Sequence, residues 1–209
     1  MATGVLGRTN RTFPKVWLRL VDRPHIAPSE LVRRALTEDS VIDISLNPAL
    51  WGGQMRGTEA CLMATGTADI RRATSRAHSA DLLQANLIEI LSAIGREWID
   101  LYFLSATEPL ADFQVEGALE ALEGAIQEGH VKHPGLACPG PIEAAWSIWR
   151  NHDAFEVMLL GRSLSERDAN ALANYARARR VGVISEEQSE MSDVSLVEFA
   201  PQDALGRPA

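Results

Sequence analysis

The stretch 79-SADLLQANLIEILSAIGREWIDLYFL-104 contains a helical pattern followed directly by a strand pattern. Ser79 is a residue type that caps helix N-termini, and Gly95 can adopt the left-handed conformation that ends a helix. Between them one apolar face recurs at helical spacing, formed by Leu82, Leu83, Leu87, Ile90, Leu91 and Ile94. The run 99-IDLYFL-104 then has the length and residue types of a buried strand. This stretch predicts one helix–strand unit of a parallel sheet.

The same change of pattern recurs along the chain. Strand-like apolar runs lie at 16–21, 41–45, 61–65, 99–104, 135–138, 156–160 and 181–185. Helical segments are marked by Pro28, Gly129, Pro141 and the capping box 165-SERD-168. No Gly-rich phosphate loop follows the first strand, which favours a closed (β/α)8 barrel over an open dinucleotide-binding sheet. The segment 194-VSLVEF-199 could be an eighth strand or a terminal segment on the surface.

Composition limits the domain count and the class of partner. The chain has 209 residues, 46% of them hydrophobic, which fits one domain over 1–209 with a polar tail at 186–209. Its 28 acidic and 20 basic residues give a net charge of −8, which disfavours nucleic-acid and membrane-surface roles. Cys61 and Cys138 are too few for a disulfide framework. With no signal-peptide pattern and no run of membrane-spanning length, a cytoplasmic protein is expected.

Three ordered segments, 79–110, 117–138 and 155–185, resemble the aldo-keto reductase family. They are similar to its "SL..LG.DYIDLY.LH", "EALE.L..EGKVR.IGVSN" and "L..YA...GIGVI" segments, and 6-LGRT-9 is similar to its opening. The resemblance covers most of residues 6–185. It implies a (β/α)8-type barrel with the active site at the carboxyl ends of the strands. It also implies carbonyl reduction with NADPH by an Asp, Tyr, Lys and His tetrad.

Three members of the implied tetrad are missing. Asp43 stands at the aspartate position, but 44-ISLNPALWGG-53 contains no tyrosine, and its Trp51 has no acidic hydroxyl with which to protonate a carbonyl. Gly66 lies where the resemblance implies the lysine, and Ser105 lies where it implies the histidine. The tetrad therefore cannot work in its usual form.

The cofactor contacts that the resemblance implies also differ. The Ser-Asn pair for the nicotinamide carboxamide maps to Ala137 and Cys138, the glutamine maps to Leu159, and the stacking tyrosine maps near Arg162. The chain ends soon after the seventh predicted strand, so we expect a truncated or incomplete barrel without the unit that holds the adenosine phosphate. No cofactor is expected.

In a barrel, the residues at the carboxyl ends of the strands converge on one mouth. Here they are Asp22, His25, Asp43, Asn47, Thr65, Asp69, Ser105, Glu108, Cys138, Arg162, Glu186 and Glu187. We expect catalytic roles for Asp43, Arg162, Glu186 and His25, and substrate contacts for Asn47, Trp51, Ser105 and Cys138. A carboxylate near Arg162 could act as a general base while the guanidinium stabilises an enolate. No metal-binding motif is present.

Several of these residues could instead have a purely structural role. Asp43 could simply cap a strand end, and Arg162 could form a salt bridge with Glu186 or Glu187. His25 could be a surface histidine, and Cys138 a small buried hydrophobic residue.

Three functions agree with this pattern. The first is a cofactor-independent lyase, isomerase or cyclase acting on a small carbonyl or polyketide-like substrate. The second is a non-catalytic binding or assembly protein, because an incomplete barrel would expose apolar surface to a second copy or a partner protein. The third is a divergent NADPH-dependent carbonyl reductase with a rebuilt site. Charged residues at the implied cofactor positions favour the first.

Overall fold

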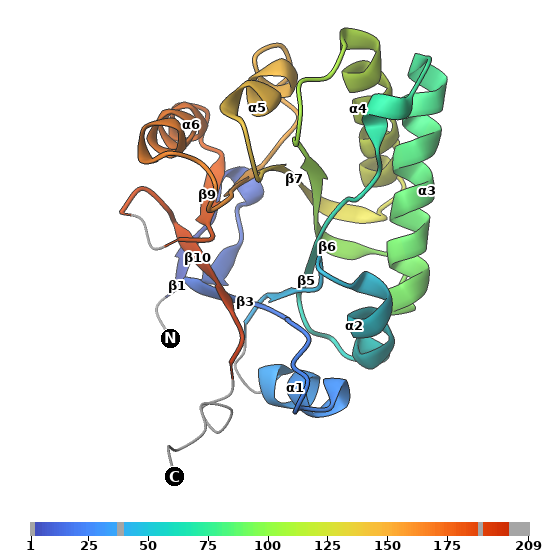
Figure 1. Ribbon diagram of the computed structural model, residues 1–209, viewed down its shortest axis with the longest axis vertical. Coiled ribbons are helices and arrows are strands. Elements are labelled where there is room, and N and C mark those ends of the chain that lie inside the picture. The colour runs from blue at the N-terminus through green and yellow to red at the C-terminus, as the bar shows by residue number, and fades with distance from the viewer. Residues whose placement is uncertain (1–2, 37–39, 188–189, 201–209) are drawn as a thin grey trace.

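The centre of the molecule is a closed barrel of eight parallel strands (Figure 1). The computed structural model describes residues 3–36, 40–187 and 190–200. In barrel order the strands are β10 (Val194–Glu198), β3 (Val16–Arg19), β4 (Ile42–Asp43), β5 (Leu62–Thr65), β6 (Ile99–Ser105), β7 (Val131–Cys138), β8 (Val157–Leu160) and β9 (Gly182–Ser185). The predicted (β/α)8 fold class is confirmed, and all seven predicted strands form.

β10 resolves the two readings of segment 194–199. It pairs in parallel with β3, where Leu196 lies opposite Trp17, and with β9, where Val194 lies opposite Ile184. The expectation of an incomplete barrel is therefore wrong, because this alternating segment closes the seam between β9 and β3. The remaining parts of the predicted tail, residues 188–189 and 201–209, lie outside the described residues.

Six helices surround the barrel in the described part of the chain (Figure 1). They are α1 (Pro28–Ala35), α2 (Pro48–Met55), α3 (Arg76–Ile94), α4 (Asp112–Gln127), α5 (Ile142–Trp149) and α6 (Glu166–Ala178), with short 3-10 turns η1 (Gly7–Thr9) and η3 (Ile70–Arg72). In the described residues, none of the helices has the length and apolar character that a membrane span needs.

The predicted helix ends are partly correct. Ser165 accepts a hydrogen bond from the Asp168 amide at 3.2 Å, and Gly95 ends α3 with a left-handed φ of 64°. α3 begins earlier than predicted, because Ser75 is its N-cap. Ser79 is instead buried and donates to the Gln114 carbonyl at 2.6 Å, which ties α3 to α4.

A hairpin that the sequence did not predict covers the amino-terminal end of the barrel. β1 (Thr3–Val5) pairs with β2 (Thr12–Pro14), and Leu6 and Phe13 join the apolar cluster inside the barrel. Gly7 has a φ of 51°, and a Cβ atom there would overlap the backbone of Gly182. The hairpin therefore packs directly on the strands, so the carboxyl ends of the strands form the mouth.

Strand alternation separates an apolar interior from a polar mouth. The interior cluster takes residues from seven strands of the barrel and from Val41, just before β4; they include Trp17, Met63, Phe103, Ile184 and Leu196. Residues two positions further along each strand face the same side. Those residues are Arg19, Asp43, Thr65, Ser105, Glu186 and Glu198.

Candidate active site at the barrel mouth

A pocket of roughly 340 Å³ opens at the carboxyl ends of the strands. Hydroxyl-bearing side chains from the ends of β4, β5 and β6 line one part of it: Ser45, Thr65, Thr67, Ser105 and Thr107. Ala137 and Leu159, from β7 and β8, line an apolar part. A second pocket of roughly 260 Å³ shares Gly66, Thr67, Ser105 and Thr107 with the first and extends toward Arg71. The mouth thus offers a small site with hydroxyl-bearing side chains on one part of its wall and apolar side chains on another.

Asp43 lies beneath this pocket and is not part of its lining. Its residue exposure is 0%. One carboxylate oxygen accepts a hydrogen bond from Arg19 Nε at 2.6 Å, and the other accepts from the Ser45 amide at 2.9 Å and from the Ser45 hydroxyl. The Ser45 hydroxyl in turn accepts from the Thr65 amide at 2.8 Å. Asp43 therefore anchors both Arg19 and the ends of two neighbouring strands.

Arg19 lines the pocket and links two carboxylates. Its side chain is 11% exposed, and it donates through Nε to Asp43 and through Nη1 to Glu186. Burial lowers the pKa of Arg19, but the two carboxylates outweigh this effect and raise the pKa above its ordinary value. The guanidinium therefore stays charged. Arg19 was not among the predicted site residues.

Glu186 is the carboxylate that lines the larger pocket. Its side chain is 14% exposed. One oxygen accepts from Arg19, and the other accepts from the backbone amide of Arg162 at 3.1 Å. The predicted proximity of Glu186 and Arg162 is therefore present in the structure. However, the Arg162 side chain is 55% exposed and lies 3.8 Å from Glu186 and 3.4 Å from Glu198, at the rim.

The other predicted site residues are divided between the pocket and the rest of the fold. Ser105 lines both pockets. His25 is exposed in the loop after β3 and lines neither of the two pockets. Asn47 caps α2 by accepting from the Leu50 amide at 3.0 Å.

Trp51 and Cys138 do not lie where we expected substrate contacts. Both are buried in the layer between the barrel and the helices. Cys138 follows Ala137, which faces the interior, so strand alternation turns the Cys138 side chain outward. Its thiol donates to the Gly140 carbonyl at 3.1 Å, and burial raises its pKa to about 11. The placement of these two residues at the mouth is therefore corrected.

A buried polar network fixes the turn at Gly66. Tyr102 donates to Asn86 at 3.1 Å, and Asn86 bonds to the Thr67 hydroxyl at 3.0 Å and to the Thr67 amide at 3.2 Å. A Cβ atom at Gly66 would overlap the Tyr102 hydroxyl and lie 3.1 Å from the Asn86 side chain. Burial also raises the pKa of Tyr102 above its ordinary value. The backbone at residue 66 therefore leaves no room for a side chain.

Metal ligands do not gather in the described parts of the chain: residues 3–36, 40–187 and 190–200 contain no group of three or more His, Cys, Asp or Glu side chains placed to hold a metal ion.

Comparison with solved structures shows which known fold this chain has. No protein-family profile matches the sequence, and no curated protein sequence matches it. Many solved structures do. A thermostable aldo-keto reductase solved with the inhibitor epalrestat has a TM-score of 0.72 and 15% identity, over 98% of this chain and 92% of that one. A Pseudomonas aeruginosa protein assigned to the aldo-keto reductases has a TM-score of 0.73 and 16% identity, over 94% and 89%.

An aldo-keto reductase from Brucella melitensis is also similar, with a TM-score of 0.67 and 14% identity over 88% of this chain and 71% of that one. The chain therefore has the fold of the aldo-keto reductases, as the resemblance in the sequence implied. At these identities the likeness concerns the fold, and activity must be argued from the side chains.

Proposed function

We propose that the barrel mouth binds a small carbonyl compound and that Glu186 transfers a proton to or from the carbon beside the carbonyl. The observation that supports this proposal is the ion pair between Glu186 and Arg19 on the wall of the pocket. Proton transfer of this kind needs no cofactor. It suits a lyase, isomerase or cyclase acting on a small carbonyl or polyketide-like substrate.

The ion pair couples proton transfer to stabilisation of the oxyanion. When a C–H bond of the substrate breaks, its proton moves to Glu186 and its electron pair moves toward the carbonyl oxygen, which forms an enolate. Protonated Glu186 no longer neutralises Arg19, so the guanidinium can donate to the enolate oxygen. The enolate then takes a proton at another atom, as in an isomerase, or expels a leaving group, as in a lyase.

The roles of Asp43 and Arg162 follow from their contacts. Asp43 is a positioning residue in this proposal, because it is fully buried and holds the Nε side of Arg19. Arg162 positions Glu186 through its backbone amide. The sequence suggested that Arg162 stabilises the oxyanion. In this proposal Arg19 does so instead, because Arg19 lines the pocket.

The residues at the mouth do not fit a nicotinamide cofactor. Ala137 and Leu159 stand at two positions where the resemblance implies polar contacts with the carboxamide, and both side chains are buried and apolar. Residue 66, the implied lysine position, has no room for a side chain. We therefore propose that the chain does not reduce carbonyls with NADPH.

Hydrogen–deuterium exchange into small carbonyl compounds tests the proposed function. A panel of hydroxyacetone, dihydroxyacetone and 2,4-pentanedione in D₂O, with the wild-type protein and no nicotinamide, would be followed by proton NMR. We expect exchange at the carbon beside the carbonyl of at least one compound to be clearly faster than in buffer alone. Binding of these compounds without any exchange would contradict the proposal and favour a non-catalytic binding protein, which the fully paired carboxylates of the resting site also permit.

NADPH and NADH are expected to leave the melting temperature unchanged. A cofactor present at 100 times its Kd would add about 2.7 kcal/mol to the free energy of unfolding. For a chain of this size that corresponds to a rise of roughly 5–10 °C. Differential scanning fluorimetry with about 1 mM of either nucleotide would detect binding of ~10 µM affinity. A rise of that size would restore the reductase hypothesis.

A further inference from the structure

Most of the net negative charge of the protein comes from one helix pair. Residues 76–97 and 112–128, which comprise α3, α4 and the residues just after each, contain eight acidic residues and two arginines. This small part of the chain therefore supplies most of the net charge of −8. One of the two arginines, Arg96, has a side chain only 10% exposed, and it donates to the carbonyls of Thr58 and Ala60. A surface with one dominant sign of charge attracts ligands of the opposite sign.

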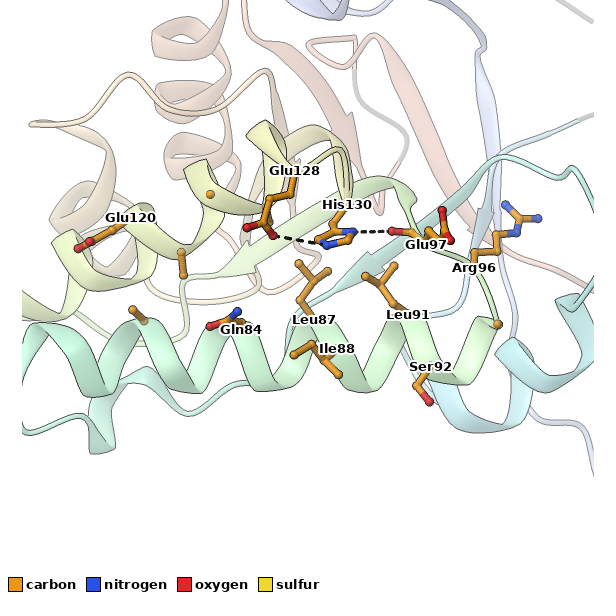
Figure 2. A pocket seen from close by; sticks show the side chains of 15 residues that line it. Gln84, Leu87, Ile88, Leu91, Ser92, Arg96, Glu97, Glu120, Glu128 and His130 are labelled. Carbon is orange, nitrogen blue, oxygen red and sulfur yellow. Dashed lines mark hydrogen bonds and ion pairs between the residues drawn. The ribbon is translucent and has the colours of Figure 1, made fainter.

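A groove of roughly 790 Å³ runs between these two helices on the outside of the barrel. Its floor is apolar: Leu87 and Leu91 point from α3 toward His130 (Figure 2). Ile88 lies on the same helix and is 58% exposed. On the α4 side, Ala121, Gly124 and Ala125 are small and leave the groove open.

Carboxylates stand along the edges of the groove. Glu128 lies 3.4 Å from His130, whose other ring nitrogen lies 2.8 Å from the Glu97 carbonyl oxygen (Figure 2). Glu97 and Glu120 also line the groove. Glu120 pairs with the exposed Arg76 at 2.8 Å, at the far end from His130. The groove thus combines an apolar floor with an acidic edge.

We propose that the α3–α4 groove is a docking surface for a positively charged amphipathic helix of another protein. The α3 side, from Ala80 to Gly95, is about 22 Å long at 1.5 Å per residue, which matches about four turns of a partner helix. Large aliphatic residues of such a helix would cover Leu87, Leu91 and Ile88, and its lysines and arginines would face the carboxylates. A second copy using this same face is disfavoured, because two acidic surfaces would repel each other.

The test uses two labelled peptides of about 18 residues, one built from leucine and lysine at helical spacing and one with glutamate in place of lysine. Fluorescence anisotropy at low salt should show binding of the lysine peptide at least ~10-fold tighter than that of the glutamate peptide. The affinity should fall as salt is raised. Backbone amide hydrogen exchange should show new protection in residues 84–97 and 120–130.

Gly124→Phe is the decisive variant. A Cβ atom at Gly124 meets nothing within 4 Å, so phenylalanine fits the fold but fills the groove. Gly53→Phe is its matched control, because Gly53 lies on α2 and also faces open space. Gly124→Phe should weaken lysine-peptide binding at least ~10-fold, while Gly53→Phe should leave it within about twofold.

Charge reversal at Glu97 and Glu128 provides a second comparison. The double change to lysine should weaken binding of the lysine peptide, and Glu143→Lys on α5 should not. Equal binding by the Gly124→Phe and Gly53→Phe variants would overturn the proposal, as would protection outside the groove. Melting curves of each variant would confirm that it is folded.

Discussion

Replacing Glu186 with glutamine is expected to slow exchange at the barrel mouth by about 10²–10⁴-fold, the usual contribution of a general base. Glutamine has nearly the same shape and keeps an oxygen that can accept from Arg19, but it cannot take up a proton. The loss should therefore appear in the rate of the chemical step, with little change in the concentration of substrate that half-saturates the protein.

Glu187→Gln is the matched control for this prediction. Glu187 is the next residue, carries the same side chain and is exposed, while its backbone amide bonds to Ser185 at 3.2 Å. Exchange by this variant should stay within about twofold of the wild-type rate, as for an ordinary surface substitution. Initial rates measured by proton NMR compare the three proteins. Wild-type rates in Glu186→Gln would remove Glu186 from the chemistry.

Replacing Arg19 with methionine should lower the free energy of unfolding by about 3–5 kcal/mol, because it leaves a buried carboxylate without its partner. Asp43 is fully buried, and Arg19 supplies its only ion pair in the described residues. Glu186 loses the same partner but can reach water. Urea unfolding followed by circular dichroism would measure the change.

The double variant Arg19→Met with Asp43→Asn distinguishes the contribution of the ion pair to stability from that of side-chain packing. Asparagine keeps an oxygen that can accept from the Ser45 amide but carries no charge, so it should recover a large part of the lost stability. If the effects of the two substitutions simply add, the stability of the mouth does not depend on the pairing of Arg19 with Asp43.

Much of the barrel could be predicted because strands and helices each leave a periodic pattern. The alternation of 194-VSLVEF-199 contained the eighth strand, but only its pairing with β3 and β9 distinguishes a strand from a surface segment. The amino-terminal hairpin has strands of three residues, too short for alternation to be visible. The sequence does not predict α2, although Asn47 and Pro48 are start signals, because Gly52 and Gly53 weaken the helical pattern. Gly52 is needed there, since a Cβ atom would lie 2.8 Å from the backbone of Ala93 on α3.

The site could be predicted only in part, because a strand residue reaches the mouth only if its side chain points to the inside of the barrel. Arg19 does not stand out as a site residue in the sequence because it lies within the apolar run 16-VWLRLV-21, yet it is two residues after the interior Trp17. The strand-end position of Cys138 predicts a place at the mouth, but Cys138 follows the inward-facing Ala137 and therefore faces outward. Alternation from an interior residue places Arg19 at the mouth and excludes Cys138 from it. Using the alternation in this way requires knowing which residue faces inward, which depends on the closed barrel.

The most direct test of the central claim uses one sample of wild-type protein with a small carbonyl compound in D₂O. Deuterium incorporation and NADPH oxidation are followed together in that sample. The proposed chemistry at Glu186 and Arg19 predicts deuterium beside the carbonyl at a rate that added NADPH does not change, with no NADPH consumed. Stoichiometric oxidation of NADPH with formation of the alcohol, and no deuterium incorporation in its absence, would contradict the claim.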